Sequence, residues 1–247
     1  MMSQHGFLEP YESSRPRAYV AMSLFAVNIL MHLIAVVSVF MQIDLLYKVM
    51  EETTQVTREQ VLANDAREAL VHYLVFASYI VTAIGFLIWV YRAYKNLRPL
   101  GANPDTTPGW AVGYFFIPIL NLFRPFQIFQ EMWRESDPET VVASGIRPMH
   151  AFIEDSSKSL LVIFWWGLWL LLNIMGWIAF SWNRNAQILN DYILASWINM
   201  ASDLLTMIAA IACIIIIMKI TNRQDEKIKR LAALAVPPEN LPAPQST

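Results

Sequence analysis

The sequence contains few charged residues and a single cysteine. Charged side chains make up only 15% of the 247 residues, whereas a soluble domain contains about one-quarter. One cysteine, Cys213, excludes an intrachain disulfide framework and a cysteine-rich zinc site. The net charge of −2 gives no basic character that would favour nucleic acid as a partner. The shortage of charge, together with a hydrophobic content of 56%, indicates a membrane protein.

Motifs of known catalytic or metal-binding chemistry are also missing. The chain has no HExxH pair, no GxSxG elbow, no Walker loop and no GxGxxG turn. The four histidines show no metal-ligand spacing; they are His5, His32, His72 and His150. We therefore predict no catalytic residue, no metal and no cofactor. An integral membrane enzyme is the less favoured alternative.

Four apolar runs have the length of ~20 residues that a helix needs to cross a membrane. These predicted spans are residues 19–43, 70–91, 160–182 and 195–218. The first is too long for the core of a signal peptide, so we interpret it as a retained anchor. The remaining parts are a tail at 1–18, an outer loop at 44–69 and a tail at 221–247 that ends in a proline-rich, disordered stretch.

Cap residues refine the ends of two of these helices. Thr57 and Gln60 have the spacing of a capping box, which predicts that the second helix begins near Arg58. No proline or glycine follows before Gly85, so this helix should continue to about Leu97 and project beyond the bilayer. The residues 155–160 supply caps for the third span.

The stretch 108–127 is a fifth apolar candidate, and positive charge argues against its crossing the membrane. With four spans and both termini in the cytoplasm, most of the 18 Lys and Arg residues lie inside, as the positive-inside rule requires. Five spans would move most of them outside and leave Arg124 in the bilayer. We therefore predict an all-α integral membrane protein with four transmembrane helices.

The residues 109–134 are predicted to form a proline-broken segment on the cytoplasmic side. Pro118 and Pro125 would each remove a helical hydrogen bond, which lipid does not tolerate on an exposed helix. The second half is amphipathic, with aromatic residues on one face and polar residues on the other. Whether the segment is re-entrant or lies flat at the interface stays open. It is either a structural belt beneath the bundle or a gate over a cavity.

A set of spaced residues in this region resembles a known family. The pattern consists of Trp89-x-x-Arg92-x-x-x-Asn96-Leu97, Pro108-Gly109-Trp110, Pro118-x-x-Asn121-Leu122-x-x-Pro125, Glu131-x-Trp133 and Gln224. It is similar to the bacterial membrane-protein family catalogued as domain of unknown function 4328, over about residues 20–225. The resemblance implies a multi-span architecture and carries no activity with it.

The polar members of this pattern, with two neighbouring arginines, form the first candidate site. They are Arg92, Asn96, Asn121, Arg124, Glu131 and Arg134. All fall near the predicted cytoplasmic interface. Arg92 and Asn96 are one turn apart, so they should share a helix face and either satisfy carbonyls freed in 114–125 or hold an anionic group. Arg124 should reach headgroup phosphates or pair with an acid such as Glu131.

A second candidate site lies within the predicted spans. His32, Asn173 and Asp203 fall at similar depths and are expected to form one polar layer. Asp203 should face inward, because a carboxylate exposed to lipid is strongly disfavoured, and should contact His32, Asn173 or Arg184. The layer is either interhelical hydrogen-bond glue or a proton- or cation-responsive pair.

These features predict a non-catalytic component of the bacterial cytoplasmic (inner) membrane. Its role would be in envelope interaction, assembly or membrane adaptation, with membrane lipids bound at the cytoplasmic side. The alternative is a small transporter or channel-like protein that uses the His32–Asp203 layer. A protein partner and the oligomeric state stay open, and no nucleic-acid partner is predicted.

Overall fold

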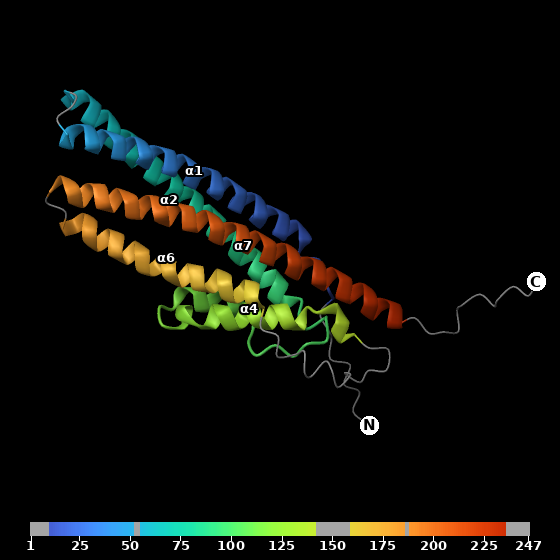
Figure 1. The fold of residues 1–247 in the computed structure, drawn as a ribbon. Coiled ribbons are helices and arrows are strands. Elements are labelled where there is room, and N and C mark those ends of the chain that lie inside the picture. The colour runs from blue at the N-terminus through green and yellow to red at the C-terminus, as the bar shows by residue number, and fades with distance from the viewer. Residues whose placement is uncertain (1–9, 52–54, 142–158, 186–187, 236–247) are drawn as a thin grey trace, which may run out of the picture. The chain divides into compact units, whose positions relative to one another are not determined.

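The computed structural model describes residues 10–51, 55–141, 159–185 and 188–235, and every regular element in these ranges is helical (Figure 1). The elements are α1 (Arg15–Met50), α2 (Arg58–Lys95), α3 (Pro108–Gly113), η1 (Tyr114–Phe116), η2 (Leu120–Leu122), α4 (Arg124–Glu135), η3 (Pro138–Thr140), α6 (Leu160–Asn185) and α7 (Leu189–Ala235). Four of them, α1, α2, α6 and α7, are long and apolar enough to cross a membrane. The prediction of four such helices is confirmed.

The long helices extend beyond the apolar runs. α1 begins at Arg15, and α7 continues for 47 residues to Ala235, so the predicted tail at 221–247 is helical in its first part. Residues 221–235 contain no proline or glycine and many strong helix formers. Hydropathy marks the end of a span and does not mark the end of a helix. The proline-rich stretch 236–247 and most of the cap sequence 155–160 lie outside the described residues.

The start of α2 follows the predicted capping box. The backbone N–H of Thr57 donates to Gln60 Oε1 at 2.9 Å, and the N–H of Gln60 donates to Thr57 Oγ1 at 3.3 Å. Two of the N–H groups that a helix start leaves unpaired are thereby satisfied. The prediction that α2 begins at Arg58 is confirmed.

The chain divides into two compact units, and each is described separately. The described residues of unit 1 fall within 1–16, 89–159 and 218–247, and those of unit 2 fall within 17–88 and 160–217. α1, α2 and α7 each contribute residues to both units.

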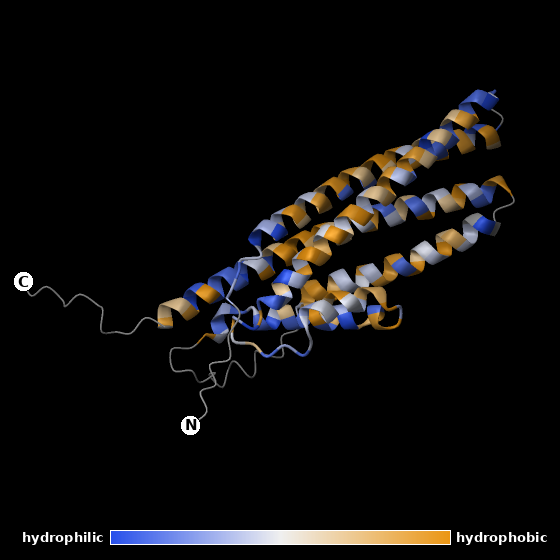
Figure 2. Ribbon diagram, turned by 180° about the vertical axis from the view of Figure 1, so that it is seen from behind, coloured by the Kyte–Doolittle hydropathy of each residue, from blue (hydrophilic) through white to orange (hydrophobic). Residues whose placement is uncertain are grey.

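Unit 2 contains the apolar parts of the four long helices. α1 and α2 approach closely where Gly85 faces Leu24, because a Cβ on Gly85 would lie 2.5 Å from Leu24 Cδ1. α2 meets α6 through Phe86 and Trp165, whose ring centroids are 6.2 Å apart. Large apolar side chains remain exposed along these helices, Tyr73 and Trp177 among the most exposed, and apolar residues run along their length (Figure 2). Such a surface is suited to lipid rather than water.

Unit 1 has a core of aromatic and apolar residues around the end of α2 and α4. Trp89, Tyr94, Phe129 and Met132 are all fully buried, and the rings of Trp89 and Phe129 lie 6.1 Å apart. This core holds α4 in place by burial of large rings.

The residues 108–135 fold back on themselves as a helical hairpin, in which α3 and η1 lead into η2 and α4 (Figure 1). Thr107 caps α3 by accepting a hydrogen bond from Trp110 N–H. Pro118 lies between η1 and η2, where the helix breaks as expected. Pro125 does not break a helix: it lies in the first turn of α4, where its missing N–H has no intrahelical partner to lose. The expectation that it removes a helical hydrogen bond was wrong.

Candidate functional site

The centre of unit 1 is a buried hydrogen-bond network around Gln224 of α7. The Gln224 side chain is fully buried. Its Oε1 accepts from Asn96 Nδ2 at 3.3 Å and from Ser14 Oγ at 3.4 Å. Its Nε2 donates to the carbonyl of Ala93 at 2.8 Å and to Ser136 Oγ at 3.2 Å. One amide therefore links the N-terminal segment, α2, α7 and the residue that follows α4.

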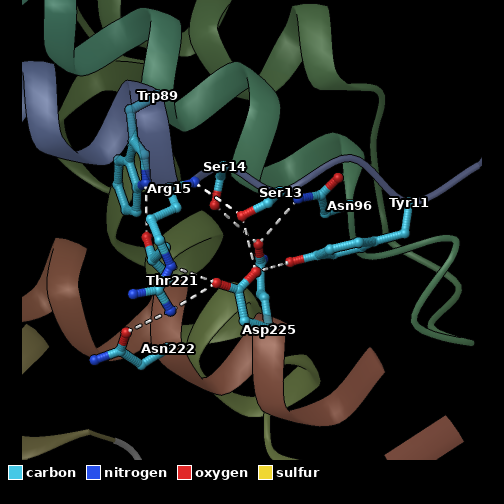
Figure 3. A network of polar contacts seen from close by, with 10 residues as sticks. Tyr11, Ser13, Ser14, Arg15, Trp89, Asn96, Thr221, Asn222 and Asp225 are labelled. Carbon is cyan, nitrogen blue, oxygen red and sulfur yellow. Dashed lines mark hydrogen bonds and ion pairs between the residues drawn. The ribbon is translucent and has the colours of Figure 1, made fainter. Parts of the chain in front are cut away.

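The N-terminal segment 10–14 continues this network on the next residue of α7. Tyr11 and Ser13 donate to Asp225 Oδ1 at 2.6 and 2.9 Å, and Arg15 pairs with Asp225 Oδ2 at 2.7 Å. Figure 3 shows these three side chains converging on the carboxylate of Asp225. Burial of the Tyr11 phenol, and its hydrogen bond to Asp225, raise its pKa well above the usual value. We call residues 10–15 the N-terminal latch.

Arg92 holds the latch from α2. Its Nε donates to the carbonyl of Glu12 at 3.1 Å, and its Nη1 lies 3.2 Å from the Glu12 carboxylate. The expectation that Arg92 and Asn96 satisfy carbonyls in 114–125 was wrong, because Arg92 binds the latch and Asn96 binds Gln224. Both side chains are buried, so neither presents an open anion site.

Glu131 is buried, although its position in the amphipathic pattern predicted a polar face. Its two oxygens accept from Tyr94 O–H at 2.6 Å and from Asp105 N–H at 2.8 Å. Glu131 follows Ile128 by three residues and thus flanks the apolar stripe of α4. Its hydrogen bonds join α4 to α2 and to the loop before α3. A buried carboxylate with two donors is a structural tie.

Arg124 does not pair with Glu131. Its Nη2 donates to Tyr114 O–H at 3.1 Å, its guanidinium lies 4.7 Å from the centroid of the same ring, and its Nη1 donates to Gln127 at 2.9 Å. The hydrogen bonds of Tyr114 with Thr106 and Arg124 lower the pKa of the phenol. Arg124 therefore braces the two arms of the hairpin.

The last two predicted residues lie apart from the Gln224 network. Asn121 lies in η2, and its Oδ1 is buried without a hydrogen-bond partner among the described residues. Arg134 is exposed and pairs with Glu135 at 3.0 Å. The six candidate residues of the first site therefore do not line one open pocket. Four of them form ties within unit 1, namely Arg92, Asn96, Arg124 and Glu131.

Three contacts of unit 1 were missed by sequence reasoning. Arg223 lies 4.6 Å from the centroid of the Trp133 ring and 2.7 Å from the Asp137 carboxylate. Lys227 donates to the carbonyl of Glu135 at 2.7 Å, at the last residue of α4. Cations commonly satisfy the carbonyls at a helix C-terminus. The available signal was the helical spacing of Arg223 and Lys227, which lie on either side of Gln224.

The hairpin ends in an exposed apolar surface. Phe116, Ile119, Leu122 and Phe123 are all exposed, and Phe116 and Ile119 leave 71% and 73% of their surface uncovered. We call these four residues the hairpin tip. Trp110 is also exposed, at the start of the same hairpin. A contiguous apolar surface of this kind marks a contact with lipid or with another protein.

The second candidate site is present in unit 2, in part. His32 Nδ1 and Asp203 Oδ1 lie 2.8 Å apart, so Asp203 contacts His32 as expected. Asn28, one turn before His32 on α1, donates to Ser78 of α2 at 2.9 Å. Asn173 does not join the layer: it is exposed and donates to the carbonyl of Trp169, four residues back on its own helix. An asparagine can satisfy its amide locally, and depth along a span does not determine which face it occupies.

The fold defines the class of the protein, which is all-helical in its described residues with four helices that are long and apolar enough to cross a membrane. Within that class, the chain belongs to the family described as Domain of unknown function (DUF4328), whose model matches residues 52–222. The match begins after α1, later than the residue-20 boundary expected from the motif. No curated protein and no solved structure matches the chain. Within the part of the chain that the structure describes, no group of three His, Cys, Asp or Glu residues is placed to hold a metal ion.

Proposed function

We propose that this protein is a non-catalytic, multi-pass component of the bacterial cytoplasmic membrane, in which unit 1 is a rigid module bound to lipid on the cytoplasmic side. The hairpin tip enters the boundary between headgroups and acyl chains. The observation that carries this proposal is the exposed apolar tip at the end of a hairpin whose polar side chains are tied to one another. The role is one of membrane organisation or assembly.

Lipid is the favoured occupant of the tip because of where unit 1 lies along the chain. The predicted spans 70–91 and 195–218 end within or at the border of unit 1, and Leu160 follows it directly. The first span begins just after residue 16, so all four long helices continue into unit 1 or adjoin it along the chain, which supports a place beside the membrane. Trp110 and Tyr114, next to the tip, are residues that favour the headgroup region, and Arg124 beside them suits phosphate. An apolar face with aromatic and basic neighbours is typical of an interfacial element.

Site-directed fluorescence tests this proposal. A single cysteine at Ile119, introduced with Cys213→Ser and labelled with an environment-sensitive dye, should show blue-shifted emission in lipid vesicles. Nitroxide groups on shallow acyl positions should quench it. Asn103→Cys, in the exposed loop before α3, is the matched control and should be quenched by aqueous iodide. Strong iodide quenching at both positions would show that the tip lies in water.

The contact between His32 and Asp203 supports a second candidate function. Two ionisable side chains 2.8 Å apart on apolar helices are the type of pair that proton pathways use. On this view the protein is a small proton-linked transporter. Asp203→Asn should then abolish proton flux in proteoliposomes, whereas Asn173→Ala, which changes an exposed amide on α6, should leave it unchanged. Flux that is the same with and without Asp203 would exclude this candidate.

A further inference from the structure

A buried polar cluster joins α1 and α2 near the loop that connects them, and the sequence analysis did not predict it. Ser38, Asn64 and Glu68 are each buried. Arg67 lies among them with 30% of its side chain exposed. All four residues belong to unit 2. Such a group at the end of an apolar helix pair requires a physical reason, since burying charge is costly.

The cluster fixes the guanidinium of Arg67. Its Nε donates to Ser38 Oγ at 3.0 Å, and its Nη2 lies within hydrogen-bond distance of the Ser38 carbonyl, Asn64 Oδ1 at 2.6 Å and Glu68 Oε1 at 3.3 Å. Ser38 in turn donates to Glu68. Nη1 has no acceptor among the described residues, so its two N–H groups are available to a ligand. Because the rest of the side chain is held in place, little rotamer entropy remains to be lost on binding.

Arg67 lines a groove between the two helices. The groove has a volume of about 530 Å³, within the range of about 300–1,000 Å³ typical of small-ligand sites. Phe40, Met41 and Leu45 of α1 line it with apolar surface, and Asp44 adds a carboxylate. One oxygen of Asp44 pairs with Lys48 at 2.6 Å. The groove therefore combines apolar surface with one acidic group, Asp44 of α1, and one basic group, Arg67 of α2.

We propose that this groove binds one phospholipid with an amine-bearing zwitterionic headgroup, of the phosphatidylethanolamine class. The phosphate accepts hydrogen bonds from Arg67 Nη1, and the ammonium group lies against Asp44. An acyl chain covers Phe40 and Met41. The headgroup matches both charges of the groove, whereas an anionic headgroup would leave Asp44 opposed by a negative ligand.

The location of the groove favours a lipid over a soluble anion. The predicted spans end at residue 43 on α1 and begin at residue 70 on α2, so the groove lies at the boundary of the apolar region. Phe40 and Met41 are exposed, and a soluble phosphate would leave them uncovered. A lipid buries the apolar wall and pairs the guanidinium at the same time. This site lies in unit 2 and is independent of the proposed role of the hairpin tip.

Native mass spectrometry of the purified full chain in detergent, titrated with phosphatidylethanolamine, tests the assignment. The wild-type protein should bind one equivalent, and more tightly than phosphatidylglycerol with the same acyl chains. Arg67→Gln should weaken this binding at least about tenfold, through loss of a charge-assisted hydrogen bond. Arg67→Gln also disturbs the polar cluster, so a second variant, Ala63→Phe, is needed. Ala63 is exposed and lines the groove. A phenyl ring at this position should displace the lipid and leave the polar cluster intact.

Two exposed positions on α2 that do not line the groove provide matched controls. Arg58→Gln removes one positive charge and Ala66→Phe adds one ring, and both should bind the lipid as the wild type does. Inorganic phosphate at the same concentration should not compete. Unchanged binding in both Arg67→Gln and Ala63→Phe would overturn the site. Equal affinity for phosphatidylglycerol, or competition by phosphate, would overturn the choice of ligand.

Discussion

Replacing Gln224 with methionine is expected to destabilise unit 1 more than any other single change to its polar core. Methionine keeps the size of the side chain, so packing changes little. It leaves two donors, Ser14 and Asn96, and the acceptors at Ala93 and Ser136 without their partner. Each buried polar group left unpaired costs about 1–3 kcal/mol. We expect a loss of about 3–5 kcal/mol and a fall in melting temperature of roughly 10 °C or more.

Thermal unfolding in one fixed detergent, followed by tryptophan fluorescence, measures this effect. Lys229→Met is the matched control, because Lys229 is exposed on the same helix, and it should change the melting temperature by no more than a degree or two. If Gln224→Met had the same melting temperature as Lys229→Met, the hydrogen bonds of Gln224 would contribute nothing to stability.

Features that depend on local sequence were predicted well. The four apolar helices follow from the length of each hydrophobic run, which burial in lipid requires. The start of α2 follows from Thr57 and Gln60, whose side chains satisfy N–H groups three residues away. Pro118 breaks the helix because, within a helix, a proline ring clashes with the carbonyl four residues back and removes a hydrogen bond. In each case the physical cause lies within one turn of the residue.

Apart from the contact of Asp203 with His32, features that depend on tertiary contacts were not predicted. Glu131 reads as part of a polar face, but it is buried because Tyr94 and Asp105 supply donors from distant parts of the chain. Arg92 was assigned to the hairpin, yet it binds Glu12, 80 residues earlier. Arg67 lies within the predicted outer loop 44–69 and was not singled out, yet it donates to Ser38 of α1. A single sequence gives no information on such pairings, because each requires the relative placement of two helices.

Several residues of the sequence pattern make structural contacts in unit 1. Gln224 and Asn96 both belong to the pattern read from the sequence, although the family model ends at residue 222, and their side chains bond to each other at 3.3 Å. The motif therefore records the ties of unit 1 rather than an open binding pocket. By contrast, the surface we propose for lipid consists of apolar residues at the hairpin tip, where the chemistry requires only exposed hydrophobic area. The polar ties of unit 1 are therefore separate from the exposed apolar residues of the hairpin tip.

Arg92→Ala is expected to release the N-terminal latch while the hairpin stays folded. The substitution removes the bonds from Arg92 to the Glu12 carbonyl and carboxylate, which hold the latch to α2. Residues 10–14 should then open more often, and a glutamate-specific protease should cleave after Glu12 at least about tenfold faster, since cleavage in this regime follows the population of the open state. The product is identified by mass as the loss of residues 1–12.

A second cleavage site distinguishes release of the latch from loss of the hairpin. Trypsin cleavage after Arg134, in the last turn of α4, should keep its wild-type rate in Arg92→Ala, because Glu131 still ties α4 to Tyr94 and Asp105. Arg98→Ala, which removes an exposed cation just beyond α2, should affect neither site. Faster cleavage after Arg134 in Arg92→Ala would show that Arg92 also holds the segment 109–134 in place. Unchanged cleavage after Glu12 would show that the latch is held by Asp225 and Gln224 alone.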